Sequence, residues 1–109
     1  MHYLENELGD FKINQIIDKD GYSLLHTAAF KNRTRIVQAL LKKAKKDLYQ
    51  YEVATWVNLK TTKDEFTALH YGSFKGNLQV MQALMENGAD MHARNQYGLN
   101  VLHIAAQGD

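Results

Sequence analysis

Apolar residues follow a helical period in three segments of the chain, residues 10–17, 33–41 and 77–85. In each segment they recur three and four positions apart, the spacing that gives a helix one apolar face. The wording is also similar, since GDFKINQII near the start aligns with GNLQVMQAL further on. The pattern predicts three amphipathic helices, the first of them part of an earlier unit.

A second phrase stands before two of these segments and recurs near the C-terminus, as GYSLLHTAA, FTALHYGS and GLNVLHIAA. The copies align on His26, His70 and His103, and the interval between the last two matches the period of roughly 33 residues that is typical of a solenoid. We therefore expect an all-α fold of stacked units, each a short helix, a turn and a longer helix. Helix-capping residue types precede each histidine by three positions. They are Ser23, Thr67 and Asn100.

This register predicts a single domain built from four units. They are a partial unit at 1–18, a longer unit at 19–61, a regular unit at 62–94 and a truncated unit at 95–109.

The longer unit contains an insertion near positions 42–56, because it exceeds the repeat period by roughly 11 residues. One interpretation is a longer helix with Tyr49, Tyr51 and Trp56 packed on the neighbouring unit. The other is a binding loop, because insertions in repeats can form such loops.

The repeated phrases resemble the G-x-T-P-L-H-x-A-A phrase of the ankyrin-repeat family, and ENGADMHARNQYG resembles the helix end, loop and hairpin of those repeats. The resemblance covers roughly residues 9–109. It implies an ankyrin-repeat solenoid of paired antiparallel helices, with hairpin loops projecting at right angles. It also implies a protein-binding scaffold with no chemistry of its own.

The last phrase, GLNVLHIAAQGD, also resembles the ankyrin part of protist palmitoyltransferases, in which repeats precede membrane spans and an Asp-His-His-Cys segment. This resemblance implies an alternative function, the substrate-recruiting region of a larger membrane enzyme. The last unit stops before its second helix and leaves an apolar face uncovered, so we expect a piece of a longer protein.

The chain departs from the family phrase at two kinds of position. Leu24, Ala68 and Val101 stand where the family has proline. Glu65 stands where glycine usually turns the hairpin. A left-handed glutamate would cost about 1 kcal/mol or more, so we expect a different turn type there.

Composition excludes several kinds of site. The chain has 109 residues, a formal net charge of +1 and no cysteine, so thiol nucleophiles and thiolate metal sites are ruled out. No apolar run approaches the roughly 18 residues of a membrane span. Neither a nucleophile-elbow motif nor a phosphate-binding glycine pattern is present. We expect no catalytic residue, no metal, no cofactor and no small-molecule ligand. The expected location is intracellular and cytoplasmic, or the cytosolic face of a membrane for the enzyme alternative.

The three aligned histidines do not predict a metal site. Metal ligands converge at about 2 Å from one ion, whereas stacked helices lie about 10 Å apart. We expect His26, His70 and His103 to be structural, each tying its own helix start to the backbone of a neighbouring loop.

A basic stretch at residues 31–46 has two interpretations. It contains seven lysines and arginines and no acidic residue, so it could contact phosphate groups of a nucleic acid. It also reads as a helix end, where lysines favourably face the negative end of the dipole. We favour the helix end and expect no nucleic-acid or membrane binding by this chain.

The expected protein-binding site is the concave face, formed by hairpin tips and the exposed ends of the first helices. Two units repeat a lysine–aspartate pair at the tip, an aromatic residue two positions later and a phenylalanine–lysine pair on the helix. Exposed aromatics with positive rims favour a partner with acidic and apolar residues, although inward packing of the two phenylalanines is the alternative. The predicted residues are Lys19, Asp20, Tyr22, Phe30, Lys31, Lys63, Asp64, Phe66, Phe74, Lys75, Tyr97, Leu99 and Gln107.

Overall fold

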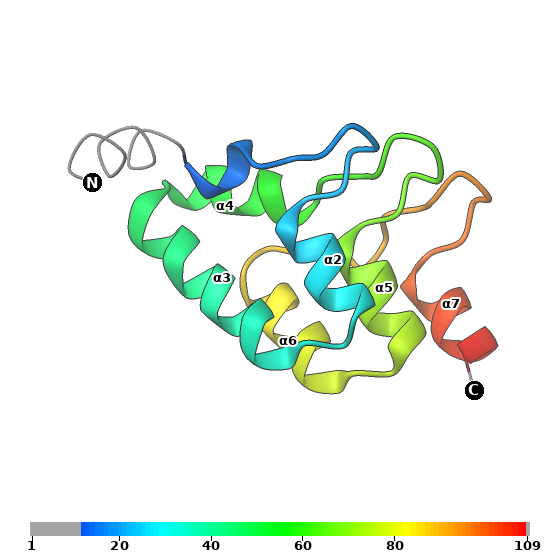
Figure 1. Cartoon of the computed structure of the whole chain (residues 1–109). Helices are drawn as coiled ribbons and strands as arrows, with labels where there is room; N and C mark the ends of the chain where they lie inside the picture. The colour runs from blue at the N-terminus through cyan, green and yellow to red at the C-terminus, as the bar shows by residue number, and fades with distance from the viewer. Residues whose placement is uncertain (1–11, 109) are drawn as a thin grey trace.

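The helices form two layers, as the all-α prediction requires (Figure 1). The computed structural model describes residues 12–108, and of residues 107 and 108 the backbone alone. One layer consists of the short helices α2, α5 and α7, and the other of α3 and α6. The elements are η1 (Ile13–Gln15), α2 (Leu24–Phe30), α3 (Thr34–Asp47), α4 (Gln50–Val57), α5 (Ala68–Lys75), α6 (Leu78–Glu86) and α7 (Val101–Gly108).

The core lies between the two layers. Leu25 and Leu69 come from the short helices, and Val37, Val80 and Leu84 come from the long ones. All five side chains are at most 1% exposed. Each helix of one layer therefore buries its apolar stripe only when its neighbours in the stack are present.

Side-chain caps begin the three short helices, as the sequence predicts. The Ser23 and Thr67 hydroxyls accept hydrogen bonds from the backbone N–H groups of His26 and His70, at 3.3 and 3.2 Å. The Asn100 side chain accepts the corresponding bond in α7 at 3.1 Å. These caps satisfy N–H groups that the helix leaves free. The helices can therefore begin at these positions although the proline of the family phrase is absent.

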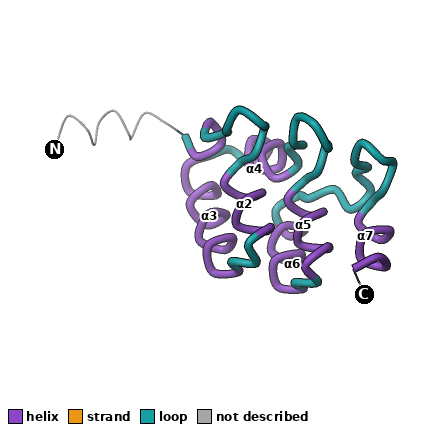
Figure 2. Tube along the Cα trace, turned by 45° about the vertical axis from the view of Figure 1, so that its right-hand side comes forward, coloured by secondary structure: helices purple, strands orange, loops and turns teal. Residues whose placement is uncertain are grey.

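Three hairpin loops project from the same side of the stack, above the N-terminal ends of the short helices (Figure 2). They are linked to each other by the backbone. The Thr62 N–H donates to the Asp20 carbonyl at 3.0 Å, and the Gln96 N–H donates to the Asp64 carbonyl at 2.9 Å. The hairpins approach so closely that a Cβ at Gly21 would lie 2.8 Å from the Thr62 nitrogen.

The hairpin at Glu65 has a different turn type, as expected. Its turn closes with the Glu65 N–H on the Thr61 carbonyl, four residues back, whereas the Gly21 and Gly98 N–H groups bond carbonyls three residues back. The accompanying expectation that glutamate would not be left-handed there is wrong. Glu65 has a φ of 57°, in the left-handed region that Gly21 and Gly98 occupy in the other hairpins. Hydrogen bonds across the turn hold this conformation: Thr61 N–H to Phe66 O at 2.9 Å, and Glu65 N–H to Thr61 O at 3.1 Å. The hairpin is one residue longer than the other two and still accepts the left-handed strain at Glu65.

Replacing Glu65 with glycine is expected to raise the free energy of unfolding by up to about 1 kcal/mol, because it removes the left-handed strain. Urea denaturation measures the change. Glu65→Ala is the control, since alanine keeps the strain and should give no gain. An equal gain in both variants would show that the turn is not strained.

The insertion in the longer unit forms a separate helix. α3 has 14 residues against 9 in α6, and α4 follows it after a break and contacts both α3 and η1. Trp56 is 1% exposed, but Tyr49 and Tyr51 are 71% and 70% exposed and stack on each other. The interpretation that packed both tyrosines is therefore wrong. The helix period sets Val53, Trp56 and Val57 on the buried face and Tyr51 opposite to them.

No helix among residues 12–108 combines the length and the apolar character that crossing a membrane requires.

Candidate protein-binding surface

Two short helices, α2 and α5, each carry a buried histidine that connects the helix to the next hairpin. The His26 Nε2 atom lies 2.9 Å from the carbonyl oxygens of Leu59 and Phe66. The His70 Nε2 atom lies 3.0 Å from the carbonyl oxygen of Ala93. The Nδ1 atoms accept the backbone N–H groups of the capping residues at 2.9 and 2.8 Å, so the proton is on Nε2, which donates to the carbonyls.

These contacts fix the protonation of the two imidazoles. Burial is the main cause that lowers the pKa of His26 and of His70 below 6.5, against the raising effect of their carbonyl partners. Among the described residues His103 bonds its own helix start alone, with the Asn100 N–H donating to Nδ1 at 3.1 Å, and its side chain is exposed. The expected tie to a neighbouring loop is therefore found for His26 and His70 and not for His103. Between residues 12 and 106, no three acidic, histidine or cysteine side chains are grouped as a metal site would require.

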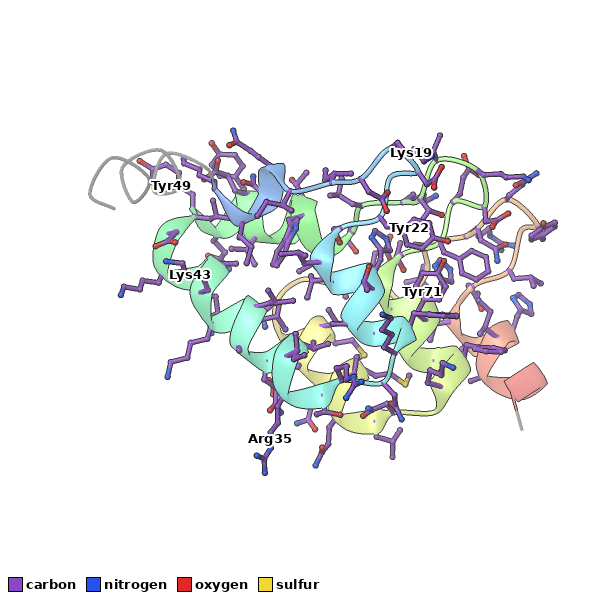
Figure 3. All side chains as sticks on the ribbon, viewed as in Figure 1. Lys19, Tyr22, Arg35, Lys43, Tyr49 and Tyr71 are labelled. Carbon is purple, nitrogen blue, oxygen red and sulfur yellow. The ribbon has the colours of Figure 1, made fainter. Side chains whose placement is uncertain are left out.

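Tyr71 is the centre of an aromatic cluster that was not predicted from the sequence. Its ring lies 6.2 Å from Tyr22, 5.5 Å from Phe30 and 5.1 Å from Phe66, measured between centroids. Its hydroxyl donates to the Tyr22 hydroxyl at 3.1 Å. Figure 3 shows Tyr22 and Tyr71 beneath the hairpins, on neighbouring units. The signal was available, because Tyr71 precedes Phe74 by three positions and such pairs share a helix face.

Phe30 and Phe74 extend this cluster to solvent. They are 48% and 52% exposed, and the Lys75 ammonium lies over both rings, 4.8 and 5.7 Å from their centroids. Phe30 also packs edge-on against Tyr71. The interpretation of an exposed contact residue therefore describes one part of its ring, and the interpretation of inward packing describes the other. We call the aromatic cluster with its lysine the aromatic–lysine surface. It consists of Tyr22, Phe30, Phe66, Tyr71, Phe74 and Lys75.

A cavity of about 300 Å³ separates the first two hairpins beside this surface. Asp20 and Asp64 line it together with Tyr22, and Thr61, Thr62 and Lys63 complete the lining. Thr61 and Thr62 were not predicted as site residues. Their position depends on the bond between neighbouring hairpins, which brings together residues far apart in sequence.

Comparison with known proteins decides the family. The family model described as ankyrin repeats (3 copies) matches residues 3–95. The chain belongs to the ankyrin-repeat family. Among solved structures, it is similar to a chain in the crystal structure of the yeast ribosomal protein Rps3 in complex with its chaperone Yar1, with a TM-score of 0.83. That match covers 98% of this chain and 75% of the other, and the sequences are 23% identical. The comparison with curated protein sequences found no match.

The ankyrin hairpins carry the remaining predicted residues. The side chains of Lys19 and Lys63 are exposed at the tips of the first two hairpins. On the third hairpin Tyr97 is 66% exposed, whereas Leu99 is partly buried. Lys31 is exposed where α2 ends, and the Gln107 side chain lies outside the described residues. Of the predicted residues, Tyr22, Phe30 and Phe66 meet at Tyr71, whereas Tyr97 makes no ring contact with them within the described residues.

The basic stretch lies mainly on α3, in the other layer. Figure 3 shows Arg35 and Lys43 pointing outward from this helix. The Lys43 ammonium pairs with the Asp47 carboxylate at 2.9 Å. Lys45 and Lys46 occupy the last turn, so the prediction of a helix end is confirmed. Cations in this turn face the negative end of the helix dipole.

Proposed function

We propose that this ankyrin-repeat protein is an interaction module that binds a partner protein on the surface formed by α2, α5 and the first two hairpins. The bound segment presents an apolar side chain between Phe30 and Phe74, and carboxylates to Lys31 and Lys75. The module has no catalytic role of its own.

The observation that carries this proposal is the pair of half-exposed phenylalanine rings under one ammonium group. The Lys75 ammonium is attracted to the faces of both rings, and about half of each phenylalanine remains exposed and available for contact. Aromatic anchors of this kind dominate binding energies at protein interfaces. Rigid backing by the buried Tyr71, which is 6% exposed, reduces the entropy lost on binding.

The fold is consistent with this role. The chain in the yeast structure has the same fold and comes from a complex of a chaperone with a ribosomal protein. It is an example of this architecture in an assembly of two proteins. The chemistry of the partner proposed here rests on the residues of this chain alone.

Reversing the charge of Lys31 and Lys75 together is expected to weaken partner binding by about tenfold or more, because like charges across an interface repel. The measurement is affinity capture from cells that express the protein, followed by titration of the purified partner against both forms. The matched control reverses Lys42 and Lys46, two exposed lysines on α3.

A partner retained by the control and lost from the Lys31→Glu, Lys75→Glu variant supports the proposed surface. Equal capture by the two variants would rule that surface out. Circular dichroism of both variants verifies that the fold is intact.

A further inference from the structure

The cavity between the first two hairpins joins the aromatic–lysine surface without a break. Tyr22 lines the cavity and stacks on Tyr71, and Tyr71 contacts Phe30, which lies beneath Lys75. A continuous track therefore leads from the hairpins along α5 to its C-terminal end. α5 has 8 residues, which at about 1.5 Å per residue gives a track of about 12 Å.

The two ends of this track carry opposite charge. At the hairpin end, Asp20 and Asp64 line the cavity, and neither carboxylate has a hydrogen-bond or ion-pair partner within the described part of the chain. Lys63 shares the lining, so the cavity carries one net negative charge. At the other end, Lys31 and Lys75 stand where α2 and α5 end.

The carboxylate of Asp64 also faces the tyrosine pair. Burial, the hydrogen bond to Tyr22 and the charge of Asp64 all raise the pKa of Tyr71. A cationic side chain entering the cavity would neutralise Asp20 and Asp64 and lie against the Tyr22 ring. Arginine and lysine both combine ion pairing with contact to an aromatic face.

From this arrangement we propose that the module recognises a bipolar segment of its partner, with a cationic side chain in the inter-hairpin cavity and a carboxylate at Lys75. An apolar side chain between them covers Phe30 and Phe74. In an extended segment, about four residues span the roughly 12 Å of α5, and the cavity lies beyond its N-terminal end, so the two charged side chains of the segment stand at least four positions apart. The cavity of about 300 Å³ has room for one long side chain. This inference rests on the proposed function and adds the requirement for a cation.

The test is selection of linear dodecapeptides from a random display library on the purified protein. Enriched clones are expected to carry a basic and an acidic residue at least four positions apart, with an apolar residue between them. Their affinity should fall about tenfold in the Asp20→Asn, Asp64→Asn variant. The control, Asp47→Asn with Glu86→Gln, removes the same charge from the second helices and should leave binding unchanged.

A charge exchange provides the sharper experiment. The Asp20→Lys, Asp64→Lys variant is expected to prefer the same peptides with glutamate in place of the basic residue. The fold should tolerate these changes, because the inter-hairpin bonds of Asp20 and Asp64 use their backbone carbonyls.

Two failures can be told apart. If no clone depends on Lys31 and Lys75, the proposed function itself is overturned. If clones depend on these lysines but lack the basic residue, or bind the Asp20→Asn, Asp64→Asn variant equally well, the surface stands and the bipolar segment is wrong.

Discussion

Replacing Trp56 with alanine is expected to lower the free energy of unfolding by about 3–5 kcal/mol. Trp56 is 1% exposed and belongs to the buried cluster that joins α4 to the rest of the core. Removing its side chain leaves a cavity that the surrounding helices fill only in part. Because small domains have a total stability of about 5–15 kcal/mol, a loss of this size is a large share of the stability of the protein. Urea denaturation followed by circular dichroism measures it.

Two further variants identify the cause. Tyr51→Ala changes an aromatic residue of the same helix that is 70% exposed, and should alter stability by no more than about 0.5 kcal/mol. Trp56→Phe should cost less than Trp56→Ala, because phenylalanine keeps much of the buried aromatic volume and leaves a smaller cavity. Both changes remove an indole N–H that has no hydrogen-bond partner among the described residues. A loss under about 1 kcal/mol in Trp56→Ala would show that α4 is not part of the cooperative core.

Acid is expected to destabilise the protein through His26 and His70. Both imidazoles have a pKa below 6.5 in the folded protein, mainly because they are buried, whereas the unfolded chain has the ordinary value of 6.5. Below pH 6.5 the unfolded state therefore binds more protons than the folded state, and the free energy of unfolding decreases as the pH is lowered. Each histidine contributes a slope of up to about 1.4 kcal/mol per pH unit, from about pH 6.5 down to its folded pKa. Above this window the contribution is fully present.

Urea denaturation at a series of pH values between about 7.5 and 5.5 measures this slope. A protonated Nδ1 can no longer accept the N–H of Ser23 or Thr67, which adds a structural reason for the loss. His70→Gln should reduce the slope by roughly half, and the control His103→Gln, at an exposed histidine, should leave it unchanged. A flat profile in the wild-type protein would contradict the assignment of both imidazoles.

The repeat register was readable from the sequence because it depends on local chemistry. Capping residues, leucines and small residues recur at fixed offsets from His26, His70 and His103, and local hydrogen bonds enforce the offset of the capping residues. Glu65 was misjudged because its turn is stabilised by bonds that offset its conformational strain. Tyr49 and Tyr51 were misjudged because the insertion breaks after α3, and a new helix sets its own buried face.

The aromatic–lysine surface was predictable only in part. The repeated phenylalanine–lysine pair marked Phe30, Phe74 and Lys75, because equivalent positions of a repeat fall on the same face of the stack. Tyr71 was missed because its role depends on contacts with Tyr22 and Phe30, which belong to the unit before it and are distant in sequence. The cavity was missed for the same reason.

The sequence by itself determined the family, the helical layers, the caps and the positions of the buried histidines, since each of these follows from residue type at a fixed spacing. The tertiary structure alone decided which aromatic rings meet and where two hairpins leave a cavity. It also decided which face of α4 is buried. These features arise where neighbouring units pack, and packing depends on the distance and angle between units, which the spacing of residues within one unit does not encode.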